Sequence, residues 1–255
     1  MAKDGLGVGG ITLGKRLHDI SADFTPGRVT AICGPNGAGK STLLSVLAGL
    51  LTAQEGTVHL GSATLPSMAP RERARALGYL PQTPEIAWDV TVETLVDLGR
   101  LPWRGGPLAE ARSGRAEDGA AIEAAIAAME LQEFRARPLS RLSGGERSRA
   151  LMARVLAGAP QWILADEPLA NLDLAHQFAL LRLLRREAEA GRGVVLVMHD
   201  LALAMNHADE VLVLDDGRRV AMDVPETALS ETVLRDVWGV EARWMGEPGK
   251  RALAL

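Results

Sequence analysis

A glycine-rich segment between an apolar run and an apolar-periodic stretch constrains the fold of this chain more than any other feature. Residues 29–33 read VTAIC, residues 34–42 read GPNGAGKST, and apolar residues then recur through LLSVLAGL. A short, wholly apolar run is typical of a strand buried on both faces, and the recurring apolar spacing predicts a helix. The segment therefore predicts a strand, a tight loop and a helix in direct succession.

Further apolar runs alternate with helix-like stretches along the chain. WILA at 162–165 and GVVLVM at 193–198 each stop at acidic or histidine residues. Such strands, separated by helices, favour an α/β fold with a parallel sheet covered on both faces. VLVLDDGRRVA at 211–221 instead predicts a hairpin that turns at Asp216 and Gly217, so the sheet is expected to be mixed.

The stretch from 84 to 157 differs because its periodicity is helical. Apolar residues from Ile122 to Met129 follow the spacing of one helix face. Residues 105–119 are rich in glycine, alanine and charge and predict a loop. The length of 255 residues suits one domain with an insertion. We expect a core of residues 1–83 and 158–225, a helical subdomain of 84–157 and a small C-terminal extension of 226–255.

Charge and cysteine content exclude some classes of function. The net charge is −4 and the sequence has no basic stripe, which argues against a nucleic-acid partner, because phosphate backbones are bound by clustered positive charge. Cys33 is the only cysteine, so a reducing compartment is expected and the thiol is predicted to pack in the core. No apolar stretch approaches the roughly 20 residues that span a bilayer, so any membrane role is expected to come through a partner.

The glycine-rich segment also carries the first chemistry. Residues 34–42 match G-x-x-x-x-G-K-[ST] in the required strand, loop and helix context. Lys40 is predicted to reach the outer phosphates of a nucleoside triphosphate, and the Ser41 hydroxyl to bind Mg²⁺. The alternative is an ordinary glycine-rich turn before a helix. The residues predicted to hold the nucleotide are Asn36, Gly37, Ala38, Gly39, Lys40, Ser41 and Thr42.

Acidic and histidine side chains follow the next two predicted strands. Asp166 and Glu167 end the run WILADE, and because ligands bind at the carboxyl ends of parallel strands, both acids are expected to face the glycine-rich loop. Asp166 is predicted to hold Mg²⁺ through water, and Glu167 to orient or deprotonate the attacking water. His199 is expected at the same edge, within reach of the γ-phosphate. A solvated acid pair and a structural histidine are the alternatives.

Two polar segments complete the set of candidate residues. Gln82 ends a short apolar segment, and its amide is predicted to bind Mg²⁺ or water, a surface-loop glutamine being the alternative. In LSGGERSRA, Ser143 and Glu146 predict a capping box. The glycines between them, Gly144 and Gly145, leave backbone N–H groups unobstructed at a helix N-terminus. This loop has no lysine of its own, so the anion expected there is the γ-phosphate of a nucleotide held by another copy of the chain.

Taken in order, these motifs resemble those of ABC-transporter nucleotide-binding subunits. The resemblance covers nearly the whole chain, from about residue 13 to 240, and LSGGE is its most specific element. Within the family, LGRLP, LSGGER and LDLAHQ are similar to the subgroup that powers bacterial import of ferric siderophores, haem and cobalamin. The motifs are the P-loop at 34–42, Gln82, LGRLP at 98–102, LSGGE at 142–146, LADEP at 164–168, ANLD at 170–173, LDLAHQ at 172–177 and His199.

The resemblance implies a P-loop NTPase core of the RecA-like type, with a helical subdomain inserted between Gln82 and the LSGGE helix. It implies an ATPase that uses ATP and Mg²⁺ and forms a homodimer over two ATP molecules. Each ATP is then sandwiched between the P-loop of one copy and Ser143–Gly145 of the other, with Asp173 touching across the interface. Hydrolysis is expected to drive uptake of an iron chelate, haem or a cobalamin-type solute. The expected partners are two integral membrane permease subunits at the cytoplasmic face of the inner membrane and, indirectly, a periplasmic or extracellular solute-binding protein.

One residue departs from the family pattern. ABC subunits usually stack an aromatic side chain on the adenine, and that position is predicted to fall at Ile11. Because Ile11 offers only apolar contact, weaker or less base-selective nucleotide binding is expected. The departure leaves an alternative open, a nucleotide-sensing interaction module with weak or no ATP turnover. An enzyme is favoured over this sensor, because the chain retains Lys40, Asp166, Glu167 and His199.

Overall fold

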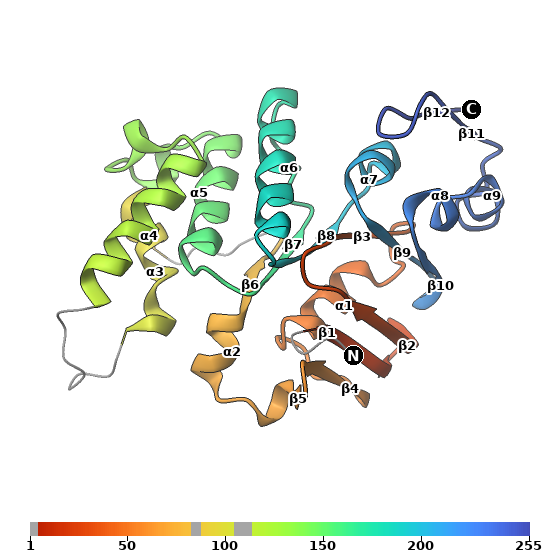
Figure 1. Cartoon of the computed structure of the whole chain (residues 1–255), viewed down its shortest axis with the longest axis horizontal. Coiled ribbons are helices and arrows are strands. Elements are labelled where there is room, and N and C mark those ends of the chain that lie inside the picture. Colours follow the sequence, from red (N-terminus) through yellow and green to blue (C-terminus); the bar gives the residue numbers. More distant parts are fainter. Residues whose placement is uncertain (1–4, 83–87, 105–113) are drawn as a thin grey trace. The chain divides into compact units, whose positions relative to one another are not determined.

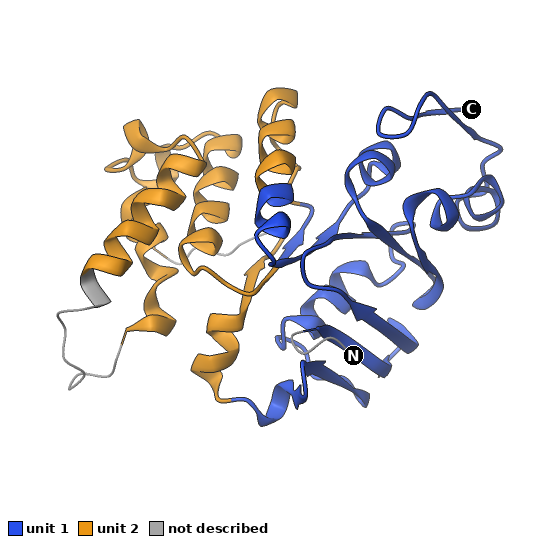
Figure 2. Ribbon diagram, in the orientation of Figure 1, with its two compact units in different colours: residues 1–68, 164–167, 184–255 blue, residues 69–163, 168–183 orange. Residues whose placement is uncertain are grey.

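The computed structural model describes residues 5–82, 88–104 and 114–255, which form two compact units (Figure 2). Unit 1 comprises Met1–Met68, Leu164–Glu167 and Leu184–Leu255, and unit 2 comprises Ala69–Ile163 and Pro168–Leu183. Both units are discontinuous in sequence, so residues far apart in the chain meet within each of them. In the described ranges, no helix is long and apolar enough to cross a membrane.

Unit 1 contains an antiparallel sheet of order β2-β1-β4-β5 and the strands of a mixed sheet that follow the order β10-β9-β3-β8-β7 (Figure 1). In the mixed sheet β3 pairs in parallel with β8 and β9, whereas β9 and β10 are antiparallel. The predicted mixed α/β arrangement is therefore confirmed. The strands are β1 (Leu6–Leu13), β2 (Leu17–Phe24), β3 (Val29–Cys33), β4 (Glu55–Leu60), β5 (Ala63–Thr64), β7 (Trp162–Asp166), β8 (Gly193–Val197), β9 (Glu210–Asp215) and β10 (Arg218–Asp223).

The predicted apolar strands form the core of the mixed sheet. β3, β7 and β8 are buried along their whole length, as wholly apolar runs predict. β9 and β10 turn at Asp216 and Gly217, whose φ angles of 42° and 70° suit a two-residue hairpin. Cys33 is fully buried, and burial raises the pKa of its thiol to about 12. Its predicted place in the core is confirmed.

The C-terminal part of unit 1 packs as helices and a small hairpin. Trp244 donates its indole N–H to the carbonyl of Leu229 (2.7 Å), and Asn206 exchanges two hydrogen bonds with the backbone of Arg251 (2.7 and 2.8 Å). The hairpin is thereby tied to helices α7 and α8. The C-terminal elements are α7 (Leu201–His207), α8 (Pro225–Ala228), α9 (Glu231–Trp238), β11 (Arg243–Met245) and β12 (Ala252–Ala254), and unit 1 also contains α1 (Lys40–Leu47) and η1 (Leu65–Ser67) nearer the N-terminus.

Unit 2 is mainly helical. The apolar stripe predicted for α4 is confirmed, because Ile126 and Met129 are buried, and α3 and α5 likewise bury Val92, Leu95 and Leu151. The elements are α2 (Pro70–Ala76), β6 (Leu77–Leu80), α3 (Val92–Leu98), η2 (Leu101–Trp103), α4 (Gly114–Ala128), η3 (Gln132–Phe134), η4 (Leu139–Arg141) and α5 (Gly144–Ala157), together with the first part of α6 (Leu174–Glu189).

Unit 2 is wider than the helical segment predicted at 84–157. It begins at Ala69 because α2 packs against η2, and it takes in the start of α6. The loop predicted for 105–119 is wrong from residue 114 onward, where α4 has already begun. Composition alone does not reveal this helix, because its early turns are held by a buried ion pair at Asp118. Residues 105–113 lie outside the described residues.

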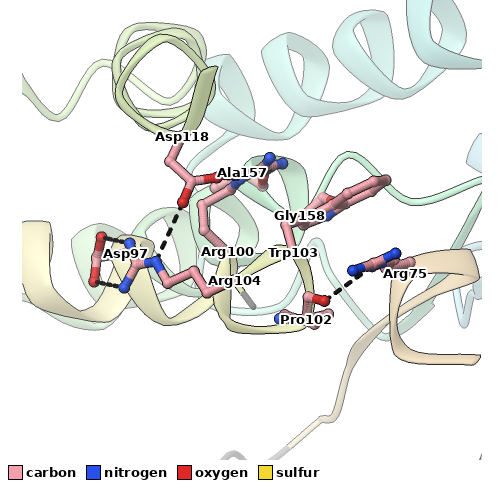
Figure 3. Close-up of polar contacts among 9 residues, drawn as sticks. All are labelled: Arg75, Asp97, Arg100, Pro102, Trp103, Arg104, Asp118, Ala157 and Gly158. Carbon is pink, nitrogen blue, oxygen red and sulfur yellow. Dashed lines mark hydrogen bonds and ion pairs between the residues drawn. The ribbon is translucent and has the colours of Figure 1, made fainter. Parts of the chain in front are cut away.

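A network of charged side chains joins the helices of unit 2 (Figure 3). Arg100 is buried, and its guanidinium donates to Asp118 Oδ1 (2.7 Å) on α4 and to the carbonyl of Ala157 (3.0 Å) at the end of α5. Burial acts to raise the pKa of Asp118, but hydrogen bonds from Arg100 and Arg104 lower it overall. Arg104 also makes a two-pronged ion pair with Asp97. The network therefore links α3, α4 and α5.

The indole of Trp103 lies beside this network. Its N–H donates to the carbonyl of Gly158 (2.8 Å), and the guanidinium groups of Arg75 and Arg100 lie 4.9 and 5.1 Å from its ring centroid (Figure 3). The hydrogen bond holds η2 against the end of α5, and the cation–π contact with Arg75 joins η2 to α2.

Candidate functional site

A glycine-rich loop joins β3 to α1 in unit 1. It needs glycine where neighbouring backbone leaves no room. A Cβ on Gly34 would lie 2.1 Å from the carbonyl oxygen of Leu214, and one on Gly39, whose φ is 95°, would lie 2.6 Å from that of Arg16. These contacts hold the loop in a tight curve ahead of the α1 N-terminus, where backbone N–H groups lack helical partners.

Lys40 closes the curve of this loop. It is only 5% exposed, and its ammonium donates to the carbonyl oxygens of Gly34 (2.9 Å) and Pro35 (2.8 Å). Burial lowers the pKa of Lys40, although the carboxylates of Glu167 and Asp166 act in the opposite direction. An ammonium has three donors. The loop carbonyls take two of them, and the third is suited to an oxygen atom of a ligand.

Ser41 and Asp166 lie together beside Lys40. The Ser41 hydroxyl donates to Asp166 Oδ1 (3.0 Å), and Asp166 is 4% exposed. Burial raises the pKa of Asp166, while the hydrogen bond from Ser41 opposes the rise. The Ser41 hydroxyl and the Asp166 carboxylate are oxygen donors of the kind that Mg²⁺ takes, either directly or through its bound water.

No group of three or more histidine, cysteine or acidic side chains gathers to hold a metal within the described ranges. Mg²⁺ is commonly held by one or two protein oxygens together with the phosphates of a substrate. The donor set of Ser41 and Asp166 is therefore compatible with the predicted metal.

Glu167 and His199 form a pair at the ends of β7 and β8. His199 Nε2 lies 2.5 Å from Glu167 Oε1, and the side chains are 46% and 17% exposed, respectively. The φ of Glu167 is 51°, a left-handed conformation that costs energy in a residue other than glycine. Unit 1 thus brings together Lys40, Ser41, Asp166, Glu167 and His199, which the sequence carries in three separate motifs.

The LSGGE segment lies in unit 2. The predicted capping box is confirmed: the backbone N–H of Ser143 donates to Glu146 Oε2 (2.7 Å), and that of Glu146 donates to the Ser143 hydroxyl (3.2 Å). A Cβ on Gly145 would lie 3.1 Å from the carbonyl oxygen of Asn171, so glycine there allows a close approach to the ANLD segment. Ser143 and Gly144 are exposed. The binding of an anion at this helix N-terminus stays a prediction.

Asp173 and Gln82 also lie in unit 2. Asp173 accepts hydrogen bonds from the backbone N–H of His176 (2.9 Å) and from its Nδ1 (2.8 Å), which lower the pKa of Asp173. Its carboxylate is largely exposed. Gln82 is exposed just after β6, and residues 83–87 lie outside the described residues. The predicted roles of both side chains stay predictions.

Residues 17–170, more than half of the chain, match the family described as ABC transporter. The chain belongs to this family. The hemin import ATP-binding protein HmuV of Rhodococcus jostii is 44% identical over 239 residues, covering 92% of this chain and 78% of the relative. HmuV of Streptomyces coelicolor is 41% identical over 239 residues, covering 94% of this chain and 83% of the relative.

Solved structures show the same fold. An inward-facing metal-chelate type ABC transporter has a TM-score of 0.80 at 24% identity, covering 98% of this chain and 96% of that chain. A dimeric ATP-binding cassette in a post-hydrolysis state with ADP and Pi has a TM-score of 0.75 at 25% identity, covering 86% of this chain and 98% of that chain. The predicted P-loop NTPase fold is confirmed.

The adenine contact predicted for Ile11, the ABC position that usually carries an aromatic residue, is wrong. Ile11 is fully buried in β1 opposite Ile20, so its side chain belongs to the core. The register of β1 against β2 shifts between Ile11 and Leu13, and the half-buried Leu13 ends the strand. The turn that follows places the carbonyl of Arg16 against the P-loop at Gly39. This contact between residues far apart in the chain is not visible in the sequence.

Proposed function

We propose that this chain is the ATP-hydrolysing subunit of an ABC importer for haem or a related iron chelate. The observation that carries the proposal is the gathering of Lys40, Ser41, Asp166, Glu167 and His199 at one edge of the unit 1 sheet. Names of the relatives support haem as the transported solute. Retention of an acid beside the phosphate loop favours an enzyme over a nucleotide sensor.

Each side chain of this cluster has a distinct part in hydrolysis. Lys40 and the loop N–H groups bind the β- and γ-phosphates. Ser41 and Asp166 would hold Mg²⁺, which when bound would neutralise charge on the phosphates. Glu167 orients the attacking water and accepts its proton on a carboxylate oxygen. His199, already hydrogen-bonded to Glu167, contacts the γ-phosphate and keeps that carboxylate aligned. Phosphoryl transfer then depends mainly on positioning and charge stabilisation.

The adenine is assigned to the turn after β1. Leu13 offers an apolar surface there, and the Arg16 guanidinium offers a planar cation that suits stacking on a base. Both are weaker platforms than an aromatic ring, so modest base selectivity is still expected.

The binding site for the γ-phosphate is completed by a second copy of the chain. In the proposed homodimer the α5 N-terminus at Ser143–Gly145 approaches the ATP bound to the partner with the N–H groups of Gly144 and Gly145, and Asp173 touches across the interface. ATP then closes the dimer and hydrolysis opens it, so binding energy becomes motion. The motion passes through Gln82 and the helices of unit 2 to two membrane permease subunits at the cytoplasmic face of the membrane, which receive the solute from a binding protein.

Light scattering of the Glu167→Gln variant tests this proposal. The variant is expected to bind ATP without hydrolysing it, so it should be a monomer with Mg-ADP and a dimer with Mg-ATP. A monomer in both states, with ATP binding confirmed by a fluorescent analogue, would contradict the sandwich. Steady ATP turnover by the wild-type chain, lost in Glu167→Gln, separates the enzyme from the alternative nucleotide sensor.

A further inference from the structure

A short segment ahead of α3 is bonded to the segment that leads into LSGGE. Thr91 and Pro138 form an antiparallel bridge within unit 2. Backbone hydrogen bonds flank this bridge on both sides, so residues 88–93 and 135–140 form a small ladder. These bonds run from the Val92 N–H to the Arg137 carbonyl (3.1 Å) and from the Leu139 N–H to the Val90 carbonyl (3.0 Å).

Asp89 extends this ladder by one residue through its side chain. One carboxylate oxygen accepts the backbone N–H of Ser140 (2.9 Å), and the other accepts the Ser140 hydroxyl (2.7 Å). These two hydrogen bonds lower the pKa of Asp89, so the carboxylate is charged at neutral pH. Hydrogen bonds to a charged acceptor are stronger than those between neutral groups. Asp89 thus holds Ser140 through both its backbone N–H and its side-chain hydroxyl.

Ser140 lies in η4, which runs directly into the N-cap of α5 at Ser143. A second contact joins the same segment to the cap, because the guanidinium of Arg137 lies 3.9 Å from a carboxylate oxygen of Glu146. The ladder therefore borders the exposed N-terminus of α5 on its N-terminal side. A displacement of residues 88–93 would be carried to that N-terminus through Asp89 and Ser140.

We infer that Asp89 is a positioning residue for the LSGGE loop. Its paired hydrogen bonds to Ser140 set the direction of the α5 N-terminus, with the N–H groups of Gly144 and Gly145, and make that direction follow residues 88–93. Asp89 touches no nucleotide in this scheme. The consequence for catalysis rests on the proposed function, in which these N–H groups meet the ATP of a second copy.

Hydrogen–deuterium exchange of the monomer tests the positioning directly. Asp89→Ala removes both bonds, and the hydrogen-bonded amides of Ser143, Glu146 and Arg147 are expected to exchange about tenfold faster. Asp89→Asn is the conservative rescue, because its amide oxygen accepts the Ser140 N–H and its NH₂ donates to the Ser140 hydroxyl. Its exchange should stay near that of the parent. Glu133→Ala is the matched control, since it removes an exposed carboxylate of unit 2 that does not contact Ser140. Unchanged exchange in Asp89→Ala would overturn the inference.

The consequence for dimer formation is measured in the Glu167→Gln background. Asp89→Ala should raise the ATP concentration that gives half-maximal dimer by about fivefold, while ATP affinity of the monomer stays constant because the P-loop lies in unit 1. Ser140→Ala should give a smaller effect, and the double variant should match Asp89→Ala alone. An unchanged midpoint with normal dimerisation contradicts the inference only. If Glu167→Gln itself never dimerises, the proposed function fails, and the exchange experiment alone decides the role of Asp89.

Discussion

The two helix N-termini assigned to ATP are built in opposite ways. α1 begins at a left-handed Gly39 with no side-chain cap, and its first residue, Lys40, is buried. α5 begins at a Ser143 that caps its own helix, and this end is exposed. The first end is surrounded by desolvated charges that are positioned before a ligand arrives, so in the proposed function it binds phosphate by itself. The second offers only N–H groups, which in the proposed function contribute when another molecule carries a phosphate to them.

Buried charge occurs in both units, but it serves different ends. In unit 1 it lies at the site, on Lys40 and Asp166, where a ligand compensates for the lost solvation. In unit 2 it lies in the pair of Arg100 and Asp118, which satisfies itself within the protein (Figure 3). Substitutions in the two places should therefore separate stability from binding.

Arg100→Ala should have the largest effect, and that effect should be a loss of folding stability. It leaves the carboxylate of Asp118, which is 11% exposed, without its shortest partner. Breaking a buried pair costs about 3–5 kcal/mol. Arg104→Ala is the control, because its side chain is 39% exposed and its pairs are expected to contribute only about 1 kcal/mol. Urea unfolding measures both. Equal losses in the two variants would mean that burial does not set the strength of this network.

Lys40→Ala should have the second-largest effect, and that effect should be a loss of ATP affinity. The variant loses the ammonium that meets the outer phosphates, and the affinity of the monomer for ATP is expected to fall about 100-fold. Ser143→Ala removes the α5 cap and should cost about 1 kcal/mol of stability, with no change in monomer affinity. Titration with a fluorescent ATP analogue makes the comparison. A loss of monomer affinity in Ser143→Ala would contradict the view that only the α1 end binds ATP unaided.

Leu13→Tyr should improve the weak adenine platform of unit 1. Stacking of an aromatic ring on a base contributes roughly 1–3 kcal/mol, so ATP affinity is expected to rise about tenfold relative to wild type. Ile11→Tyr is the matched comparison, because it places the same ring in the core, where overpacking lowers stability by about 1–3 kcal/mol. Affinities for ATP and for inorganic triphosphate distinguish base contact from phosphate contact. If Ile11→Tyr alone tightened ATP binding, the register assigned here would be wrong.

This pair of variants also marks the boundary of what the sequence predicts. The strand, loop and helix around Lys40 follow from apolar spacing and glycine placement, and the grouping of Asp166, Glu167 and His199 follows from the ends of parallel strands. Ile11 was misplaced because a register shift in β1 leaves no trace in composition. The packing of Arg16 on Gly39 joins the antiparallel sheet to the P-loop, and such long-range contact has no local signal.

In unit 2 as well, local features were predictable from the sequence and long-range contacts were not. The capping box at Ser143 was predictable because it depends on two residues three positions apart. The bonds from Asp89 to Ser140 were not, since they join residues 51 positions apart and neither residue stands out in the sequence. The start of α4 at residue 114 was missed for a related reason, because a buried partner for Asp118 comes from a different element.

Glu210→Gln should have the smallest effect. Its change in folding stability measures the free-energy cost of burying a carboxylate in unit 1 at a position outside the proposed nucleotide site. Burial raises the pKa of Glu210, although Arg28 and Arg219 act to lower it, and its Oε2 is buried without a hydrogen-bond partner in the part of the chain that the structure describes. Because folding raises this pKa, the associated stability is full below the unfolded pKa near 4.5 and is lost as pH rises through the folded pKa.

The neutral variant should therefore be about 1 kcal/mol more stable than wild type at pH 8, with the difference closing as the pH falls to about 4. Urea midpoints at the two pH values measure this, and Glu241→Gln, at an exposed carboxylate, should show no difference at either. A gap of the same size at both pH values would mean that the gain comes from packing rather than from removal of a buried charge. The raised pKa of Asp166 would then need a cause other than burial, and the contrast between the two helix N-termini would lose its electrostatic basis.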